Sequence, residues 1–294
     1  MKDYTLYKTT IKPLSNFSTV LKGDTFFGHI CWAIVYRYGE DKLKELLKSY
    51  DLKPFIIVSD GFTSGYLPKP KMPSYLLGED PKEKKENRKK IWLSLKDLQE
   101  AKFNNAKTAK EIGEDKELDI VRNSINYKAF KTDGEQFSPY SESEMKLTKK
   151  DIYFLLHKDF SLDLLNEILE LLSEFGYGKD TTIGKGRFQF TKLEKVDIDF
   201  KGKYFMTLSP SDISGYKAYY ENFVRFGKLG GNRANTNPFK KPLILADSAA
   251  VVMFDEQKEC KYIGKAIKNI STYEDVVHQG YAITIPIGVK NEKI

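Results

Sequence analysis

The chain has 294 residues, of which 40% are hydrophobic and 30% are charged, and its net charge is +7. This composition is typical of a globular protein and excludes collagen-like, low-complexity and disordered classes. Two distant cysteines, Cys31 and Cys260, exclude a disulfide framework and a cysteine-based zinc site, and we expect no metal and no cofactor. No apolar run approaches the ~20 residues of a membrane helix, and no signal peptide opens the chain. We therefore expect a cytoplasmic protein without membrane contact.

The N-terminal part shows alternating strand and helix patterns. The expected order is strand 4–11, helix 25–36, a short helix 41–49, strand 54–59, an insertion, strand 151–156, helix 161–175 and strand 187–193. Asp24 is placed to cap the first helix, while Ser161 and Gly176 are placed to begin and end the last one. Apart from the short helix, this is the βαββαβ pattern of a ferredoxin-like, or RRM-like, sheet with two helices on one face.

The insertion covers residues 61–150 and is irregular. Four prolines between residues 61 and 81 favour loops, whereas residues 82–103 read as one charged helix. The run 82–90 has a net charge of +4, which suits either a solvated helix face or a surface for RNA or a partner subunit. Asp133-Gly134 indicates the turn of a hairpin within residues 121–140.

Beyond residue 199 the strand pattern restarts, with further strands expected at 204–208, 243–246, 250–254 and 282–287. The predicted fold class is therefore α+β, with two ferredoxin-like domains. The N-terminal domain is expected at 1–198, including the insertion, and a smaller α+β domain at 199–294.

A glycine-rich loop at 176–186 has four glycines in eleven residues. It matches neither the Walker motif nor G-x-G-x-x-G, and its order is helix, loop, strand. Its backbone N–H groups, together with Lys179, Lys185 and Arg187, suit a sugar–phosphate backbone. A plain turn that caps a helix is the alternative.

The loop and several other segments resemble one family. Gly178-Lys179 followed by Ile183-Gly-Lys-Gly-Arg-Phe188 resembles the glycine-rich loop of the RAMP superfamily of CRISPR RNA-binding proteins, and 21–33 resembles its first helix. The segment 60–70 resembles its second strand and proline loop, and 122–137 its thumb hairpin. The segments 221–227 and 279–286 are similar to the subgroup that caps the foot of type III-A (Csm) effector complexes. Many relatives have Asp-Arg where this chain has Asn126-Tyr127, so the role of that arginine is open here.

The resemblance implies a non-catalytic subunit that binds crRNA. It would hold the 5′ tag of the guide between a large polymerase-domain subunit and a backbone RNA-cleaving subunit, and would meet target RNA only indirectly. Loop chemistry and resemblance together assign the RNA contacts to Lys22, Thr25, Arg122, Asn123, Lys128, Gly178, Lys179, Thr181, Thr182, Ile183, Gly184, Lys185, Gly186, Arg187, Arg225 and Arg233. Phe130, Phe137 and Tyr140 offer either stacking surfaces for bases or ordinary packing within the hairpin.

Two alternatives stay open. His29 lies in the first helix, where related processing endonucleases of the superfamily place a general acid or base, so a metal-independent repeat endoribonuclease is the first alternative. The second is the equivalent subunit of a type III-B or type I complex, or a generic RNA-binding protein. Apolar neighbours of His29 favour a packing role, and we expect no enzyme.

Overall fold

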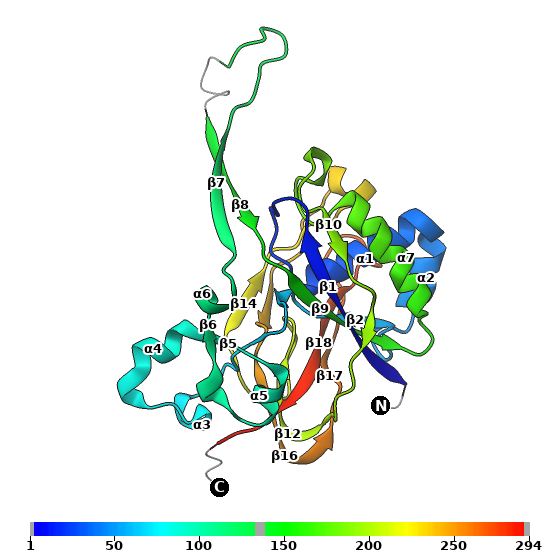
Figure 1. The fold of residues 1–294 in the computed structure, drawn as a ribbon. Helices are drawn as coiled ribbons and strands as arrows, with labels where there is room; N and C mark the ends of the chain where they lie inside the picture. Colours follow the sequence, from blue (N-terminus) through cyan, green and yellow to red (C-terminus); the bar gives the residue numbers. More distant parts are fainter. Residues whose placement is uncertain (1–2, 133–138, 291–294) are drawn as a thin grey trace.

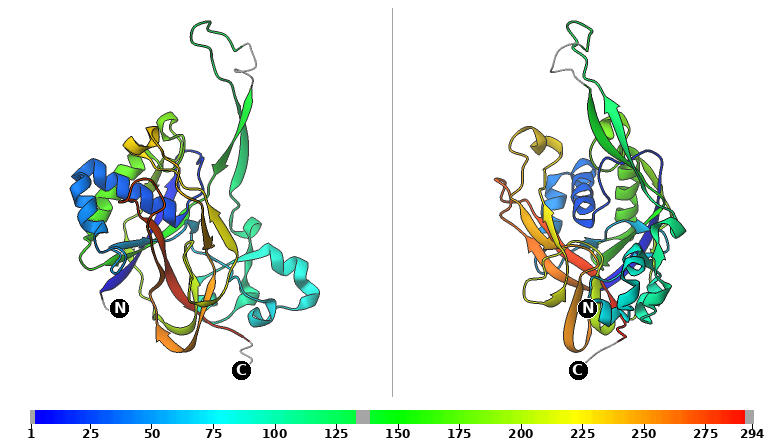
Figure 2. Two further views of the ribbon diagram at one scale, coloured as in Figure 1. Left: turned by 180° about the vertical axis from the view of Figure 1, so that it is seen from behind. Right: turned by 90° about the vertical axis from the view of Figure 1, so that its left-hand side faces the viewer.

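A computed structural model describes residues 3–132 and 139–290. The chain forms one body, from which a long hairpin projects (Figure 1). Figure 2 shows that the hairpin stands away from the body in two further views. The predicted α+β class is confirmed, because helices and antiparallel sheets both build the body.

The first sheet has the ferredoxin-like topology predicted from the strand and helix patterns. Its main strands are β1 (Tyr4–Pro13), β2 (Ile56–Val58), β9 (Lys150–His157) and β10 (Phe188–Phe190). They lie in the order β10-β1-β9-β2, so the first and third strands of the unit occupy the centre. The short strands β3 (Phe62–Thr63) and β11 (Glu194–Lys195) extend its edges.

Two helices connect these strands and pack against each other. They are α1 (Gly23–Tyr38) and α7 (Leu162–Phe175), and a third helix, α2 (Glu40–Leu47), follows α1. The α7 prediction is confirmed in detail: Ser161 Oγ accepts from the Leu164 N–H, and the Gly176 N–H donates to the Leu172 carbonyl. Leu165, Ile168 and Leu172 are buried, whereas Phe175 at the helix end is exposed.

The part of the insertion before the thumb forms a small three-stranded sheet with short helices, and the prediction of a single helix over 82–103 is wrong. Its strands are β4 (Leu67–Pro68), β5 (Lys90–Leu93) and β6 (Lys107–Thr108), and its helices are α3 (Ser74–Leu77), α4 (Lys84–Lys89), α5 (Leu95–Gln99) and α6 (Ala109–Ile112). Pairing of β5 with both β4 and β6 overrides the helical pattern. Ser94 then begins a new helix, because its Oγ accepts from the Asp97 N–H.

The projecting hairpin, called the thumb here, consists of β7 (Lys116–Arg122) and β8 (Tyr140–Lys146) with the segment between them. The thumb begins at Lys116, whereas the sequence placed the start of the hairpin at residue 121. The predicted turn at 133–134 lies outside the described residues. Residues directly opposite in an antiparallel pair share a face, so Arg122, Glu142 and Glu144 lie on one side of the thumb.

The second half contains a five-stranded antiparallel sheet in the order β13-β16-β12-β18-β17. Its strands are β12 (Lys201–Thr207), β13 (Lys217–Tyr219), β16 (Val251–Glu259), β17 (Tyr262–Ile267) and β18 (His278–Ile287), and a separate ribbon pairs β14 (Asn222–Arg225) with β15 (Leu243–Ala246). Between residues 201 and 290 the only helical turn is η5 (Gly231–Asn235). Glycine- and proline-containing loops connect these strands.

The two halves share one hydrophobic core. Buried residues of β1, β9, α1 and α7 belong to the same cluster as Tyr281, Ile283 and Ile285 of β18. The buried side chain of Gln279 also bonds to both backbone groups of Val58, at 2.9 and 2.8 Å, and so continues the hydrogen bonding of the first sheet at its β2 edge. The domain boundary expected between residues 198 and 199 stays a prediction.

Candidate nucleic-acid interface

The glycine-rich loop is built around one buried tyrosine. Tyr177 stacks on Phe26 at 5.5 Å between ring centroids, and its hydroxyl donates to the Val20 carbonyl at 2.8 Å. The Tyr177 N–H bonds to the Gly186 carbonyl across the neck of the loop. Gly186 has φ +69°, and a Cβ there would lie 2.0 Å from the Tyr177 carbonyl oxygen, so only glycine fits.

His29 of α1 holds the other side of this loop. Its Nε2 accepts a hydrogen bond from the Gly178 N–H at 3.1 Å, and its ring lies 4.8 Å from that of Tyr177. Burial lowers the pKa of His29 to about 4. The imidazole is therefore neutral near pH 7, with its proton on Nδ1.

The base of the thumb reaches the glycine-rich loop through ion pairs. Lys179 Nζ lies 2.6 Å from Glu142 Oε1, and Lys185 Nζ lies 2.6 Å from Glu144 Oε2. Arg122 contacts both carboxylates, at 3.2 Å to Glu142 and 2.6 Å to Glu144. The structure thus brings together three predicted RNA-binding cations, from segments more than fifty residues apart, and pairs all of them with acids.

Glu144 is the centre of this cluster. Its side chain is 1% exposed and accepts from Lys185, Arg122 and, at 3.0 Å, Asn16 Nδ2. Burial alone would raise the pKa of Glu144, but the three donors outweigh it and lower the pKa to about 2. The carboxylate is therefore ionised near neutral pH.

The N-terminus of α1 is a second cluster of charges, and Asp24 does not cap the helix as expected. The cap position is Lys22, and Asp60 Oδ1 accepts from the Gly23 N–H at 2.8 Å, so a distant carboxylate satisfies the helix end. Lys22 Nζ lies between Asp60, at 2.9 Å, and Asp247, at 2.6 Å. Lys22 is thus engaged within the chain.

Asp24 instead joins the two halves of the molecule. Its carboxylate accepts two hydrogen bonds from Arg225, at 2.6 and 2.5 Å, and His278 Nε2 lies 3.4 Å away. Burial would raise the pKa of Asp24, but His278 and Arg225 lower it overall. Arg225 therefore lies in an internal ion pair rather than on a free surface, and an RNA contact there stays a prediction.

The remaining predicted contacts are distributed over three places. Thr25 lies beside Asp24; Asn123 and Lys128 are exposed in the outer part of the thumb; and Thr181, Thr182 and Ile183 form a 3₁₀ turn next to Gly184. Arg187 follows the loop with an exposed side chain. In the same outer part of the thumb, Phe130 is 83% exposed, which favours the stacking alternative over packing. Phe137 lies outside the described residues.

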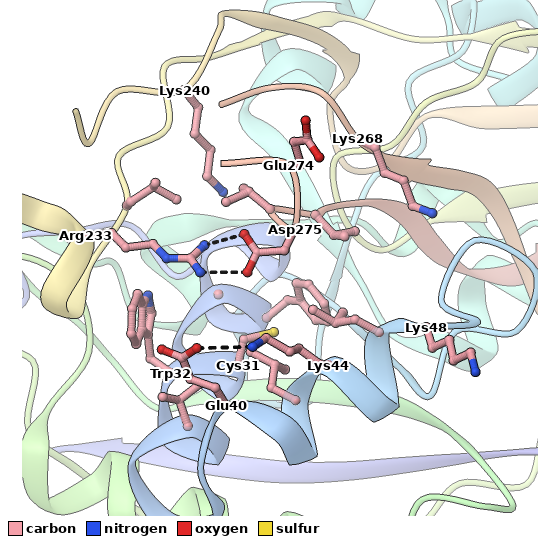
Figure 3. A pocket seen from close by; sticks show the side chains of 18 residues that line it. Cys31, Trp32, Glu40, Lys44, Lys48, Arg233, Lys240, Lys268, Glu274 and Asp275 are labelled. Atoms are coloured by element: carbon pink, nitrogen blue, oxygen red, sulfur yellow. Dashed lines mark hydrogen bonds and ion pairs between the residues drawn. The ribbon is translucent and has the colours of Figure 1, made fainter. Parts of the chain in front are cut away.

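Arg233 lies apart from the loop, at a cavity of about 330 Å³ between α1, α2 and the C-terminal half. It forms a bidentate pair with Asp275, at 2.8 and 2.7 Å, and Figure 3 shows this pair above Trp32. The ammonium group of Lys240 points toward the same cavity, and burial lowers the pKa of this lysine. Arg233 is therefore paired with a carboxylate, as Lys179 and Lys185 are, and an RNA contact there stays a prediction.

Sequence reasoning missed the acids that engage these cations. Glu142 and Glu144 are two residues apart on a strand and so share one face, which is a visible signal. Asp60 and Asp247 gave no such signal, because they meet Lys22 only through long-range packing. Within residues 3–132 and 139–290 no group of three or more His, Cys, Asp or Glu side chains is arranged to hold a metal ion. No helix in the described part of the chain is long and apolar enough to cross a membrane.

Several solved structures share this fold over the whole chain. A chain of the Csm1–Csm4 cassette in complex with AMPPNP has 19% identity and a TM-score of 0.62, with 99% of this chain and 100% of that chain covered. A chain of the same cassette with pppApA has 18% identity and a TM-score of 0.61, covering 98% and 100%. A chain of the Csm3–Csm4 subcomplex of the type III-A CRISPR-Cas interference complex has 16% identity and a TM-score of 0.57, covering 96% and 99%.

No curated protein matches the chain in sequence. The family model described as "RAMP superfamily" matches residues 12–189, which is more than half of the chain and contains both the glycine-rich loop and the thumb. The resemblance read from the motifs is thereby confirmed at the level of the family. The chain belongs to the RAMP superfamily.

Proposed function

We propose that this chain is the Csm4-type subunit of a type III-A CRISPR interference complex, in which it binds crRNA and holds the 5′ tag of the guide. The observation that carries the proposal is the correspondence of fold along nearly the whole of both chains with structures of Csm1–Csm4 and Csm3–Csm4. Csm4 is the component common to those two assemblies. On this proposal the chain docks a large polymerase-domain subunit on one side and a backbone RNA-cleaving subunit on the other.

The geometry of the loop supports an RNA contact. Gly184 has φ +86°, and a Cβ there would meet no atom within 4 Å, so the backbone at this turn is open to a ligand. Lys179 and Arg187 flank it with side chains that reach solvent. Single-stranded RNA held through phosphates leaves its bases free to stack on aromatic residues such as Phe130.

The bonding of His29 supports a non-catalytic role. A general acid or base near neutral pH needs a pKa close to 7 and access to the scissile phosphate. The pKa of His29 is lowered to about 4 by burial, and its Nε2 is occupied by the Gly178 N–H. We therefore propose that cleavage of RNA belongs to neighbouring subunits.

The first test is to co-express the chain with a CRISPR array and its neighbouring genes, purify it and sequence the bound RNA. Guides that share one intact 5′ tag, with a large and a backbone subunit in the same preparation, are the expected result. A random sample of cellular RNA would contradict the tag-holding role. RNA newly cut by the purified chain alone would contradict the non-catalytic role, and His29→Ala would then be the variant to assay.

A second test measures the salt dependence of RNA binding. We expect Lys179→Ala with Arg187→Ala to weaken binding and to flatten the plot of log K against log salt by about 0.7 per lost phosphate contact. Lys185 is left unchanged, because it neutralises the buried Glu144. The matched control is Lys110→Ala with Lys217→Ala, which removes two exposed lysines elsewhere. Equal slopes for the two double variants would argue against the loop as the phosphate site.

A further inference from the structure

The two ion pairs between thumb and loop differ in exposure, although they lie side by side. Glu144 is 1% exposed and is bonded by three donors from three different segments. Glu142 is 21% exposed, and its partner Lys179 is 59% exposed. The acid of the first pair is therefore inaccessible to a large ligand, whereas both members of the second pair reach solvent.

The exposed pair involves a cation that the proposed function assigns to RNA. Lys179 follows Gly178, and its own N–H bonds to Thr19 Oγ1 at 2.9 Å, so its backbone is fixed against the start of α1 while its side chain extends to the thumb. A lysine ammonium donates charge-assisted hydrogen bonds to a carboxylate or to a phosphate in the same way. Glu142 therefore offers Lys179 an anionic oxygen acceptor, as an RNA phosphate would.

Arg122 lies between the two acids and contacts both of them. Its contact with Glu142 is 3.2 Å and its contact with Glu144 is 2.6 Å. If Glu142 moves away, Arg122 and Lys185 still hold Glu144, which together with Asn16 keeps the thumb attached to the body. One carboxylate is thus free to leave without loss of the other contacts.

We propose that Glu142 acts as an internal substitute for an RNA phosphate: it occupies Lys179 in the RNA-free chain and is displaced when RNA binds, while Glu144 keeps the thumb on the glycine-rich loop. This inference rests on the proposed function, because it takes Lys179 as an RNA contact. Because Glu142 competes with phosphate for Lys179, RNA binds more weakly than it would to a chain without this carboxylate.

The test compares Glu142→Gln with a matched control on the same hairpin, Glu117→Gln. Glu117 pairs with Met145 in the register of the hairpin, so it lies on the face opposite Glu142, and its side chain is exposed. Both variants remove one negative charge, but only the first removes a competitor for Lys179. Binding is measured by fluorescence anisotropy with labelled oligouridine and the full chain, because phosphate contacts do not depend on base sequence.

We expect Glu142→Gln to bind oligouridine a few-fold more tightly than wild type, and more tightly than Glu117→Gln. The gain should be smaller on a Lys179→Met background, where the substitution releases only the longer contact of Arg122. Limited proteolysis of the thumb supplies a second readout. Glu144→Gln is expected to speed cleavage within the thumb, whereas Glu142→Gln is expected to change it little.

If Glu142 has only a structural role, the opposite result is expected. Its loss would then weaken RNA binding and expose the thumb to protease, as the loss of Glu144 does, and either finding would overturn the proposal. Equal affinities of Glu142→Gln and Glu117→Gln would overturn it as well. Failure of wild type to bind oligouridine at all would contradict the proposed RNA contact itself, so the two failures are distinguishable.

Discussion

Two regions of this molecule place predicted RNA-binding cations beside carboxylates, and they use them differently. At the N-terminus of α1, Arg225 bonds to Asp24, whose side chain is 1% exposed, and the pair joins the second half of the chain to the first helix. At the base of the thumb, Lys179 bonds to Glu142 at the surface. Both cations pair with a carboxylate, but the carboxylate is buried in the first region and partly exposed in the second.

The difference teaches which cation is available to a ligand. A buried carboxylate cannot release its partner, because the uncompensated charge would remain in a low-dielectric environment. A partly exposed carboxylate is stabilised by water when its partner leaves. Lys179 at the thumb base is therefore a better candidate for phosphate binding than Arg225 at the start of α1, although the sequence assigned both to RNA.

The largest expected effect comes from breaking the buried pair. Arg225→Met leaves the Asp24 carboxylate buried with the Thr25 N–H and His278 as its remaining partners, and we expect it to lower the free energy of unfolding by about 3–5 kcal/mol. Urea unfolding followed by circular dichroism measures this change. Lys179→Met is the matched control from the other region, and its stability should stay close to that of wild type. Similar losses in the two variants would remove the distinction between the regions.

A second pair of variants sharpens the comparison within the loop. Gly184 and Gly186 both have positive φ, but a Cβ on Gly184 meets no atom within 4 Å, whereas one on Gly186 meets the Tyr177 carbonyl oxygen at 2.0 Å. We expect Gly184→Ala to cost about 1 kcal/mol of stability and Gly186→Ala about 3 kcal/mol. Thermal unfolding of the two proteins under one condition checks this. Equal losses of stability in the two variants would mean that the backbone around Gly186 shifts to accommodate a side chain.

A further expected effect is a dependence of stability on pH, with one histidine in each region. Burial lowers the pKa of both His29, at the loop, and His278, beside Asp24, to about 4. Unfolded histidine titrates near pH 6.5, so between about pH 6.5 and 4 the unfolded chain binds protons that the folded chain does not. The free energy of unfolding should therefore fall as the pH falls through this window, by up to about 1.4 kcal/mol per pH unit for each histidine.

His29→Gln separates the two contributions. Glutamine keeps an acceptor for the Gly178 N–H but cannot titrate, so the stability difference between pH 7 and pH 5 should shrink by about half. Chemical unfolding at the two pH values provides the measurement. An unchanged pH difference would show that His29 titrates in the folded chain as it does in the unfolded one.

Much of the fold was predictable because its signals are local. The apolar stripe and caps of α7, the alternation in β1 and the glycine at the end of α7 all follow from neighbours in the chain. The helix expected over 82–103 was wrong because β5 obtains its partners from β4 and β6, which local periodicity does not reveal. Asp24 was misjudged for a similar reason, since its partner Arg225 lies two hundred residues away.

By itself the sequence determined the ferredoxin-like order of strands and helices, the glycine-rich loop and the set of basic residues that suit RNA, because periodicity, turn residues and charge are written along the chain. Tertiary structure alone decided which of those basic residues pair with a buried acid and which pair with an exposed one. Ion pairs form between segments that packing brings together, and burial of the acid, which no local pattern encodes, separates a structural cation such as Arg225 from an exchangeable one such as Lys179.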